Sequence, residues 1–225
     1  MVIRLAVLDM AGTTVSDGGV VERSFVEALT GLGFDPAGDQ MREHLDYVRR
    51  TMGQSKITVF RSVFGGDEDM AQDANRRFES AFDRAVSRGE IEPLPGAELT
   101  LDALRAGGVR ICLTTGFSSG TREQLIDVLG WRDVIDLSLS PGDGVRGRPY
   151  PDMILTALMR LEVDSVHELA VAGDTTSDLV AGTAAGASVV AGVLTGAHDR
   201  RQLESAPHTH VLGSIAELPA VTFPT

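Results

Sequence analysis

The sequence has very little of several residue types, and each shortage excludes a class of protein. The 225-residue chain contains one cysteine, Cys112, which excludes an internal disulfide framework and fits a reducing compartment. Its net charge of −12 excludes a general binder of nucleic acids or of anionic membrane surfaces. No run reaches the roughly 18 apolar residues of a membrane span, and the apolar run at residues 5–8 is too short for a signal peptide. We therefore expect a soluble, cytoplasmic protein without nucleic-acid or membrane partners.

Lysine is also nearly absent. Of the 20 basic residues, 19 are arginine and only Lys56 is lysine. One interpretation is a coding bias that left a single lysine at random. The other is that position 56 needs a primary amine, which a guanidinium cannot replace.

What the chain does have is an alternation of apolar strands and helical patterns. Strands are predicted at the residues that share a short, apolar pattern bounded by turn signals: 2–8, 109–113, 134–139, 169–172, 188–193 and, more weakly, 210–212. Helical spacing is found in the segments between them: 97–105, 119–129, 151–161 and 177–185. This alternation predicts an α/β fold, with a mostly parallel sheet covered by helices on both faces in three layers.

The segment from residue 20 to residue 88 has a different character. Its apolar residues recur at helical spacing, which predicts four or five helices and no strand. The first strand therefore belongs to the α/β body, and an all-helical block is inserted directly after it. We expect a core domain made of residues 1–14 and 94–225, and a second, helical domain at residues 15–93.

Polar residues follow several of the predicted strands. Asp9 follows the first strand and Thr115 the second, Asp174 and Asp178 follow the fourth, and Arg148 precedes a helix. Ligands of open parallel sheets bind outside the carboxyl ends of the strands, so these side chains are expected to meet at one edge. Neighbouring carboxylates are unfavourable without a cation, and an oxygen-only donor set suits Mg²⁺. Arg148 suits a phosphoryl group.

These residues, in this order, resemble the haloacid dehalogenase superfamily along the whole chain. The resemblance implies a Rossmann-like core with a mobile helical cap. It also implies that Asp9 is a nucleophile that forms an aspartyl-phosphate. The implied Mg²⁺ ligands are Asp9, the Ala11 carbonyl, Asp174 and Asp178.

Two departures from the common superfamily pattern indicate which family of the superfamily the chain resembles most. Phosphatases of the superfamily usually have a second aspartate two residues after the nucleophile, which protonates the leaving group, whereas this chain has Ala11. The usual lysine of the basic loop is replaced by Arg148. At both positions the chain resembles the phosphonoacetaldehyde hydrolases, which cleave a carbon–phosphorus bond. That family has a Schiff-base lysine shortly after Met-Gly, and Lys56 stands in this position after Met52-Gly53.

The same resemblance implies a catalytic set of Asp9, Lys56, Thr115 and Arg148. The substrate-binding residues that it implies are Gly12, Met52, Gly53 and Gly116. The chain departs from the phosphonoacetaldehyde hydrolases at Val59 and Phe117, where that family has histidine and tyrosine. These departures leave the substrate open between phosphonoacetaldehyde and an altered phosphonoaldehyde, for example a hydroxylated one. The resemblance leaves open a homodimer formed through the cap.

Two other functions remain open from the sequence. One is a phosphomonoesterase of small metabolites that works without the acidic residue that Ala11 replaces. The other is a non-catalytic sensor of phosphorylated metabolites with the same fold. Several residues carry no functional prediction: Cys112 is expected to pack inside a strand, and Arg49 and Arg50 to lie on a solvated helix face.

Overall fold

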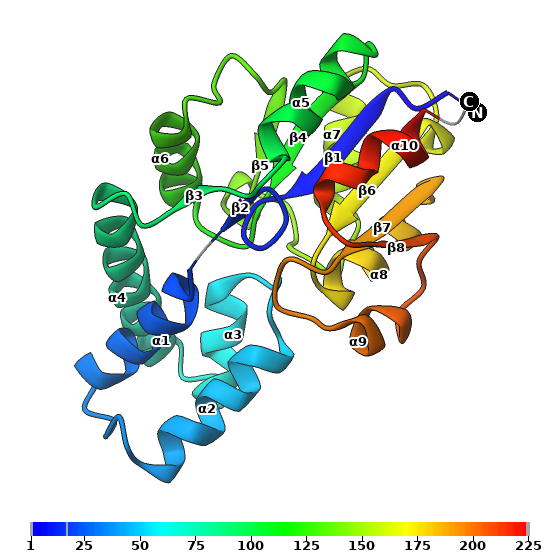
Figure 1. Ribbon diagram of the computed structural model, residues 1–225. Coiled ribbons are helices and arrows are strands. Elements are labelled where there is room, and N and C mark those ends of the chain that lie inside the picture. Colours follow the sequence, from blue (N-terminus) through cyan, green and yellow to red (C-terminus); the bar gives the residue numbers. More distant parts are fainter. Residues whose placement is uncertain (1, 17, 224–225) are drawn as a thin grey trace.

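The computed structural model describes residues 2–16 and 18–223, and residues 1, 17, 224 and 225 of the expected domains lie outside the described residues. Figure 1 shows a twisted sheet with helices on both faces and a further group of helices beyond one edge. Within the described residues the main sheet has six strands, in the order β5 (Leu137–Leu139), β4 (Arg110–Thr114), β1 (Leu5–Asp9), β6 (Leu169–Gly173), β7 (Val189–Val193) and β8 (His210–Leu212).

All neighbouring strands of this sheet are parallel. Strand β1 lies near the centre between β4 and β6, and all five of its residues are buried, as expected for a strand covered on both faces. Because Asp9 pairs with Thr114 in register, the last residues of β1 and β4 lie at the same edge. The sheet therefore brings the predicted strand-end residues to one edge, and the predicted α/β class is confirmed.

Helices cover the sheet on two faces. Side chains alternate along β1, so that Ala6 and Leu8 pack in one apolar cluster and Leu5 and Val7 in the other. The first face contacts α5 (Ala97–Ala106) and α10 (Leu218–Thr222), and the second contacts α7 (Asp152–Arg160) and α8 (Thr176–Ala184). The remaining elements are short: α9 (Arg200–Glu204) and the 3₁₀ helices Pro141–Asp143, Val166–Glu168 and Ile215–Glu217. None of the helices in the described part of the chain combines the length and apolar character needed to span a bilayer.

The helical insertion consists of α1 (Val20–Gly31), α2 (Asp39–Arg50), α3 (Lys56–Val63) and α4 (Glu68–Ser87). The two connections to the core pair as short antiparallel strands, β2 (Val15–Ser16) and β3 (Glu92–Pro93). Helix α4 begins where the Asp67 side chain accepts the Met70 N–H, with Glu68 and Asp69 in its first turn. The predicted helical block is therefore present between β1 and α5. The domain boundaries at residues 15 and 93 stay a prediction.

Two predicted strands began too early. The strand predicted at residues 2–8 begins only at Leu5. Residues 134–139 were expected to be extended, but β5 begins only at Leu137. The N–H groups of Val134 and Ile135 both donate to the Trp131 carbonyl, so this part of the segment closes a turn. Apolar residues alone do not distinguish a turn that packs on the core from a strand.

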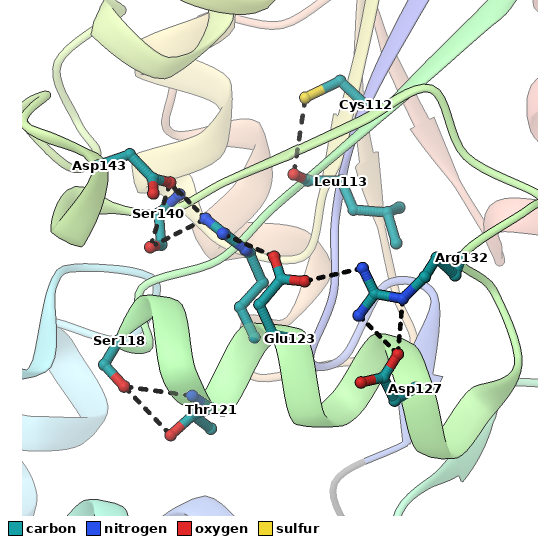
Figure 2. Close-up of polar contacts among 10 residues, drawn as sticks. Cys112, Leu113, Ser118, Thr121, Glu123, Asp127, Arg132, Ser140 and Asp143 are labelled. Carbon is teal, nitrogen blue, oxygen red and sulfur yellow. Dashed lines mark hydrogen bonds and ion pairs between the residues drawn. The ribbon is translucent and has the colours of Figure 1, made fainter.

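Helix α6 (Ser119–Leu129) fixes the loop that follows β4. Figure 2 shows the Ser118 hydroxyl at the start of the helix, where it accepts the Thr121 N–H. At the other end Arg132 pairs with Glu123 and Asp127, as the same figure shows. The start of α6 is thereby fixed directly after residues 115–117, which carry candidate site residues.

Phenylalanines join the helical insertion to the core. Phe78 of α4 lies 4.7 Å from Phe25 and 6.2 Å from Phe60, measured between ring centroids. Phe82 lies 4.3 Å from Phe117, which belongs to the loop after β4. All five rings are buried. This aromatic cluster, residues 25, 60, 78, 82 and 117, packs across the junction between the insertion and the sheet.

We expect Phe78→Ala to lower the free energy of unfolding by about 3–5 kcal/mol, because it removes the ring at the centre of the aromatic cluster and leaves a cavity. Urea denaturation measures the change. Leu99→Ala is the control, since Leu99 is 75% exposed and its loss should change stability by no more than about 0.5 kcal/mol. A loss below about 1 kcal/mol for Phe78→Ala would contradict the packing described here.

Candidate active site

A cavity of about 380 Å³ opens at the carboxyl edge of the sheet, between the core and the helical insertion. Both parts of the chain supply its walls. All but one of the predicted site residues line it: Asp9, Ala11, Gly12, Met52, Gly53, Lys56, Thr115, Gly116, Arg148 and Asp174. Asp178 is the exception. The structure therefore gathers residues far apart in the sequence around one space.

Asp9 ends β1, and the chain turns sharply after it. Thr13, Thr14 and Val15 all donate their N–H groups to the Met10 carbonyl, and the Thr14 hydroxyl donates to the Asp9 carbonyl. Gly12 has a φ of +86°, and a Cβ there would lie 2.5 Å from Asp174 Oδ2. Only glycine allows this turn to approach Asp174 so closely.

Arg148 lies between two carboxylates. One of its terminal nitrogens donates to Asp9 Oδ1 at 2.5 Å and also to Asp178. Burial raises the pKa of Asp9 to about 6, although the Arg148 guanidinium lowers it. Burial would lower the pKa of Arg148, but Asp178 and Asp9 raise it above its usual value. Arg148 is therefore a permanent cation beside Asp9.

Asp178 is held at the start of α8 by hydrogen bonds from Thr175 and Arg148. Its Oδ2 accepts the Thr175 N–H at 3.0 Å and the Thr175 hydroxyl at 2.5 Å, and its Oδ1 accepts from Arg148. This is a capping box at the start of α8. Asp178 does not line the cavity, so its effect on the site passes through Arg148. Its assignment as a metal ligand stays a prediction.

Asp174 is held by a loop that sequence reasoning missed. The Ala197 N–H donates to Asp174 Oδ2 at 2.6 Å, and the Thr195 hydroxyl donates to the Gly12 carbonyl at 2.7 Å. Burial raises the pKa of Asp174 well above its usual value, and the charges of Asp9 and Asp178 add to this effect. Thr195 lies two residues after the predicted strand at 188–193. The strand-end argument, applied to that strand too, would have found it.

Lys56 is the first residue of α3, and only 8% of it is exposed. Its backbone N–H donates to the Gly116 carbonyl at 3.2 Å. Its side-chain Nζ lies 5.1 Å from the centroid of the Phe117 ring. Both Phe117 and Lys56 line the cavity that Asp9 also lines. Val59, one helical turn further, packs in the apolar core instead. The single lysine side chain of the protein thus belongs to the same cavity as Asp9.

The helical insertion touches the core closely beside Lys56. A Cβ on Gly53, whose φ is +84°, would lie 2.4 Å from Thr175 Oγ1. A Cβ on Gly116 would lie 2.5 Å from the Gln54 carbonyl oxygen. Glycine at both positions lets the segment 52–56 approach the loops of the sheet edge.

The donor set at the sheet edge fits a small, hard cation. Asp9 and Asp174 supply buried carboxylates, and Ala11 lines the same cavity. No group of three or more His, Cys, Asp or Glu side chains is placed to hold a metal within residues 2–16 and 18–223. Mg²⁺ does not need such a group, because one or two carboxylates, waters and a substrate phosphate are its usual ligands. A cation would also offset the charge of carboxylates that burial already disfavours.

Arg49 and Glu22 were not predicted to belong to the site. Arg49 was assigned to a solvated helix face, but it lines the cavity and pairs with Glu22, which also lines it. The two residues are 27 positions apart and meet only because α1 packs beside α2. No local signal in the sequence indicates this pairing. Cys112, by contrast, is fully buried in β4, as predicted.

Comparison with protein families identifies the chain. The family model described as haloacid dehalogenase-like hydrolase matches residues 3–186. The chain belongs to this family. It is therefore a hydrolase of the haloacid dehalogenase family, and the predicted resemblance is confirmed at this level.

Relatives of this hydrolase carry two kinds of name. A Bacteroides fragilis protein named phosphonoacetaldehyde hydrolase is 28% identical over 232 residues, covering 92% of this chain and 81% of the relative. A Dickeya dadantii protein named probable phosphatase IndB is 25% identical and covers 95% of this chain and 91% of the relative. The crystal structure of a phosphonoacetaldehyde hydrolase-like protein from Oleispira antarctica superposes with a TM-score of 0.83 at 24% identity, covering 98% of this chain and 91% of that one. This last similarity shows the shared fold.

Proposed function

We propose that this hydrolase cleaves the carbon–phosphorus bond of a small phosphonoaldehyde, phosphonoacetaldehyde or a close analogue. The observation that carries the proposal is the presence of Lys56 in the same cavity as Asp9, with Ala11 two residues after Asp9. A carbon leaving group has no oxygen to protonate, so an acid at position 11 is not needed. An amine that can accept electrons through an imine is needed, and Lys56 is the only lysine.

The first step joins Lys56 to the substrate. Its amine condenses with the aldehyde, releasing one water molecule and forming a protonated imine. The Phe117 ring beside Nζ limits water access to this side of the imine.

The second step breaks the carbon–phosphorus bond. An Asp9 oxygen attacks phosphorus, and the bond's electron pair moves into the carbon chain to give an enamine and an aspartyl-phosphate. Arg148 and Thr115 hold the phosphoryl oxygens as charge develops on them. The enamine takes up a proton at carbon, and one water hydrolyses the resulting imine to free the aldehyde product and Lys56. A second water hydrolyses the aspartyl-phosphate to phosphate.

Asp9, the Ala11 carbonyl and Asp174 would hold Mg²⁺ in this scheme, with Asp178 acting through Arg148. When bound, the metal ion supplies electrophilic stabilisation of the phosphoryl group and offsets the charge of Asp9. Gly12, Met52, Gly53 and Gly116 would shape the space around the substrate.

Two measurements test the proposal. Purified protein is assayed for phosphate release from phosphonoacetaldehyde and from phosphate esters, with and without Mg²⁺. Borohydride is then added during turnover, and the peptide that contains Lys56 is examined by mass spectrometry. We expect phosphate from the phosphonate and a reduced adduct at Lys56. An unmodified Lys56 during rapid turnover would refute the imine.

A phosphomonoesterase is the second candidate, favoured by the relative named probable phosphatase IndB. The assay above distinguishes it. Ala11 cannot protonate an alcohol, so esters with poor leaving groups should react slowly. Faster release from sugar phosphates than from phosphonoacetaldehyde would favour the phosphatase.

Thr195→Val is expected to weaken Mg²⁺ binding about tenfold, because the loss of the hydroxyl frees the Gly12 carbonyl and loosens the turn that carries Ala11. Thermal unfolding at increasing Mg²⁺ concentrations reports the affinity without requiring activity. Thr195→Ser keeps the hydroxyl and should bind Mg²⁺ like the wild type. Equal affinities for all three proteins would show that the Thr195 contact does not support the metal site.

Other parts of the proposal concern the setting of the reaction. We propose residues 15–93 as a cap domain that closes over the sheet edge and excludes water from the imine. A cytoplasmic location agrees with the single buried cysteine, and the acidic chain has no feature that favours nucleic acid. Size determination in solution tests the homodimer through the cap.

A further inference from the structure

Two charged residues of the cavity have no role in the reaction proposed above. Among the residues that the structure describes, the charged side chains that line the cavity are Asp9, Glu22, Arg49, Lys56, Arg148 and Asp174. Four of them act at the phosphoryl group or the imine. Glu22 of α1 and Arg49 of α2 remain, and both come from the helical insertion.

Glu22 and Arg49 form a fixed pair. Arg49 Nε donates to Glu22 Oε2 at 2.9 Å, and an Arg49 terminal nitrogen donates to Oε1 at 2.6 Å, so the contact is bidentate. The other terminal nitrogen donates to Asp46 at 3.0 Å. The hydrogen bond from Arg49 lowers the pKa of Glu22, which is therefore ionised near neutral pH. Side chains held in this way present their remaining lone pairs and N–H groups in a defined direction.

The cavity is larger than phosphonoacetaldehyde requires. That molecule has seven non-hydrogen atoms, and seven water molecules occupy about 210 Å³ of liquid at about 30 Å³ each. The cavity volume of about 380 Å³ exceeds this upper bound, so a longer substrate fits.

The charges around the pair decide which chemical group it accepts. Of the two cavity-lining residues, Glu22 is an anion and Arg49 a cation, so the charge of the pair favours neither a carboxylate nor an ammonium. A neutral hydroxyl can donate to Glu22 and accept from Arg49 at the same time. We propose that the substrate is a ketone analogue of phosphonoacetaldehyde, in which a hydroxymethyl group replaces the hydrogen on the carbonyl carbon, and that Glu22 and Arg49 bind the hydroxyl of this group. This assignment rests on the proposed function, because that function places the carbonyl at Lys56.

The test uses two β-ketophosphonates that differ by one hydroxyl, 3-hydroxy-2-oxopropylphosphonate and 2-oxopropylphosphonate. Binding of each is measured by calorimetry in an Asp9→Asn background, which cannot form the aspartyl-phosphate. We expect the hydroxylated compound to bind about tenfold more tightly, the scale of a hydrogen bond to a charged group at a partly exposed site. Adding Glu22→Met should reduce this ratio to about one.

The matched control is Glu68→Met in the same background. Glu68 forms the same bidentate contact with Arg61, at 2.7 Å for both hydrogen bonds, but neither residue lines the cavity. The binding ratio should be unchanged in this control. A ratio near one in the Asp9→Asn protein, or a ratio that Glu22→Met leaves unchanged, overturns the inference and shows that the pair only joins α1 to α2.

The proposed function is judged separately, by phosphate release from phosphonoacetaldehyde with Asp9 intact. Phosphate release together with equal binding of the two ketones would overturn the hydroxyl site alone. Preferential, Glu22-dependent binding of the hydroxylated ketone without any carbon–phosphorus cleavage would support the hydroxyl site and refute the proposed reaction.

Discussion

Lys56→Arg is expected to lower kcat/KM for phosphonoacetaldehyde about 10³-fold or more, because a guanidinium does not form the imine. Phosphate release measures the loss, and far-ultraviolet circular dichroism monitors the fold. The position is only 8% exposed, so a larger arginine could disturb packing against Phe117. Lys56→Met keeps the length of the side chain without an amine and should lose as much activity.

Because the protein has a single lysine, the borohydride trapping of Lys56 gives a clear result. Lys56 carries the only side-chain primary amine of the protein, so reductive trapping has no competing lysine side chain. Both variants should show no adduct within the α3 peptide. If Lys56→Met kept more than a tenth of the wild-type rate, the amine would not be part of the reaction.

Gly53→Ala is expected to lower kcat/KM about 100-fold, because the new Cβ would lie 2.4 Å from Thr175 Oγ1 and push the segment 52–56 away from the sheet edge. Displacement of a reacting group by about 1 Å commonly reduces rates by this factor. Steady-state kinetics with the phosphonate measures the effect.

Gly65→Ala separates steric contact from backbone strain. Gly65 also lies in the helical insertion and has a φ of +61°, but nothing lies within 4 Å of a Cβ added there. Both variants have a similar backbone penalty of about 1 kcal/mol, and Gly53→Ala alone adds the steric contact with Thr175. Only Gly53→Ala should lose most of its activity, and equal activity losses would rule out the close approach as the cause.

The sequence predicted those features that depend on periodicity and on strand ends. The positions of Asp9, Thr115 and Asp174 follow from parallel strands that share one edge, and the structure places all three at the cavity. The helical block was recognised because its apolar residues change period from that of the flanking segments. Both patterns are local, so a single chain is enough to detect them.

Other features depend on how elements pack, and these could not be predicted. The Glu22–Arg49 pair exists because two helices of the insertion lie side by side, and helix periodicity does not indicate which neighbour each face meets. Asp178 follows a strand, like a ligand, but a capping box with Thr175 and a contact with Arg148 occupy its oxygens. An aspartate after a strand suits a helix start and a metal equally well, and the role of Asp178 as a metal ligand stays a prediction.

The contact between the Phe117 and Phe82 rings has a thermodynamic consequence. The two rings belong to the core and to α4, so any separation of these parts exposes aromatic surface to water. Hydration of apolar surface raises the heat capacity. The free-energy difference between the joined and separated forms should therefore vary nonlinearly with temperature. The joined form should become less favoured on cooling.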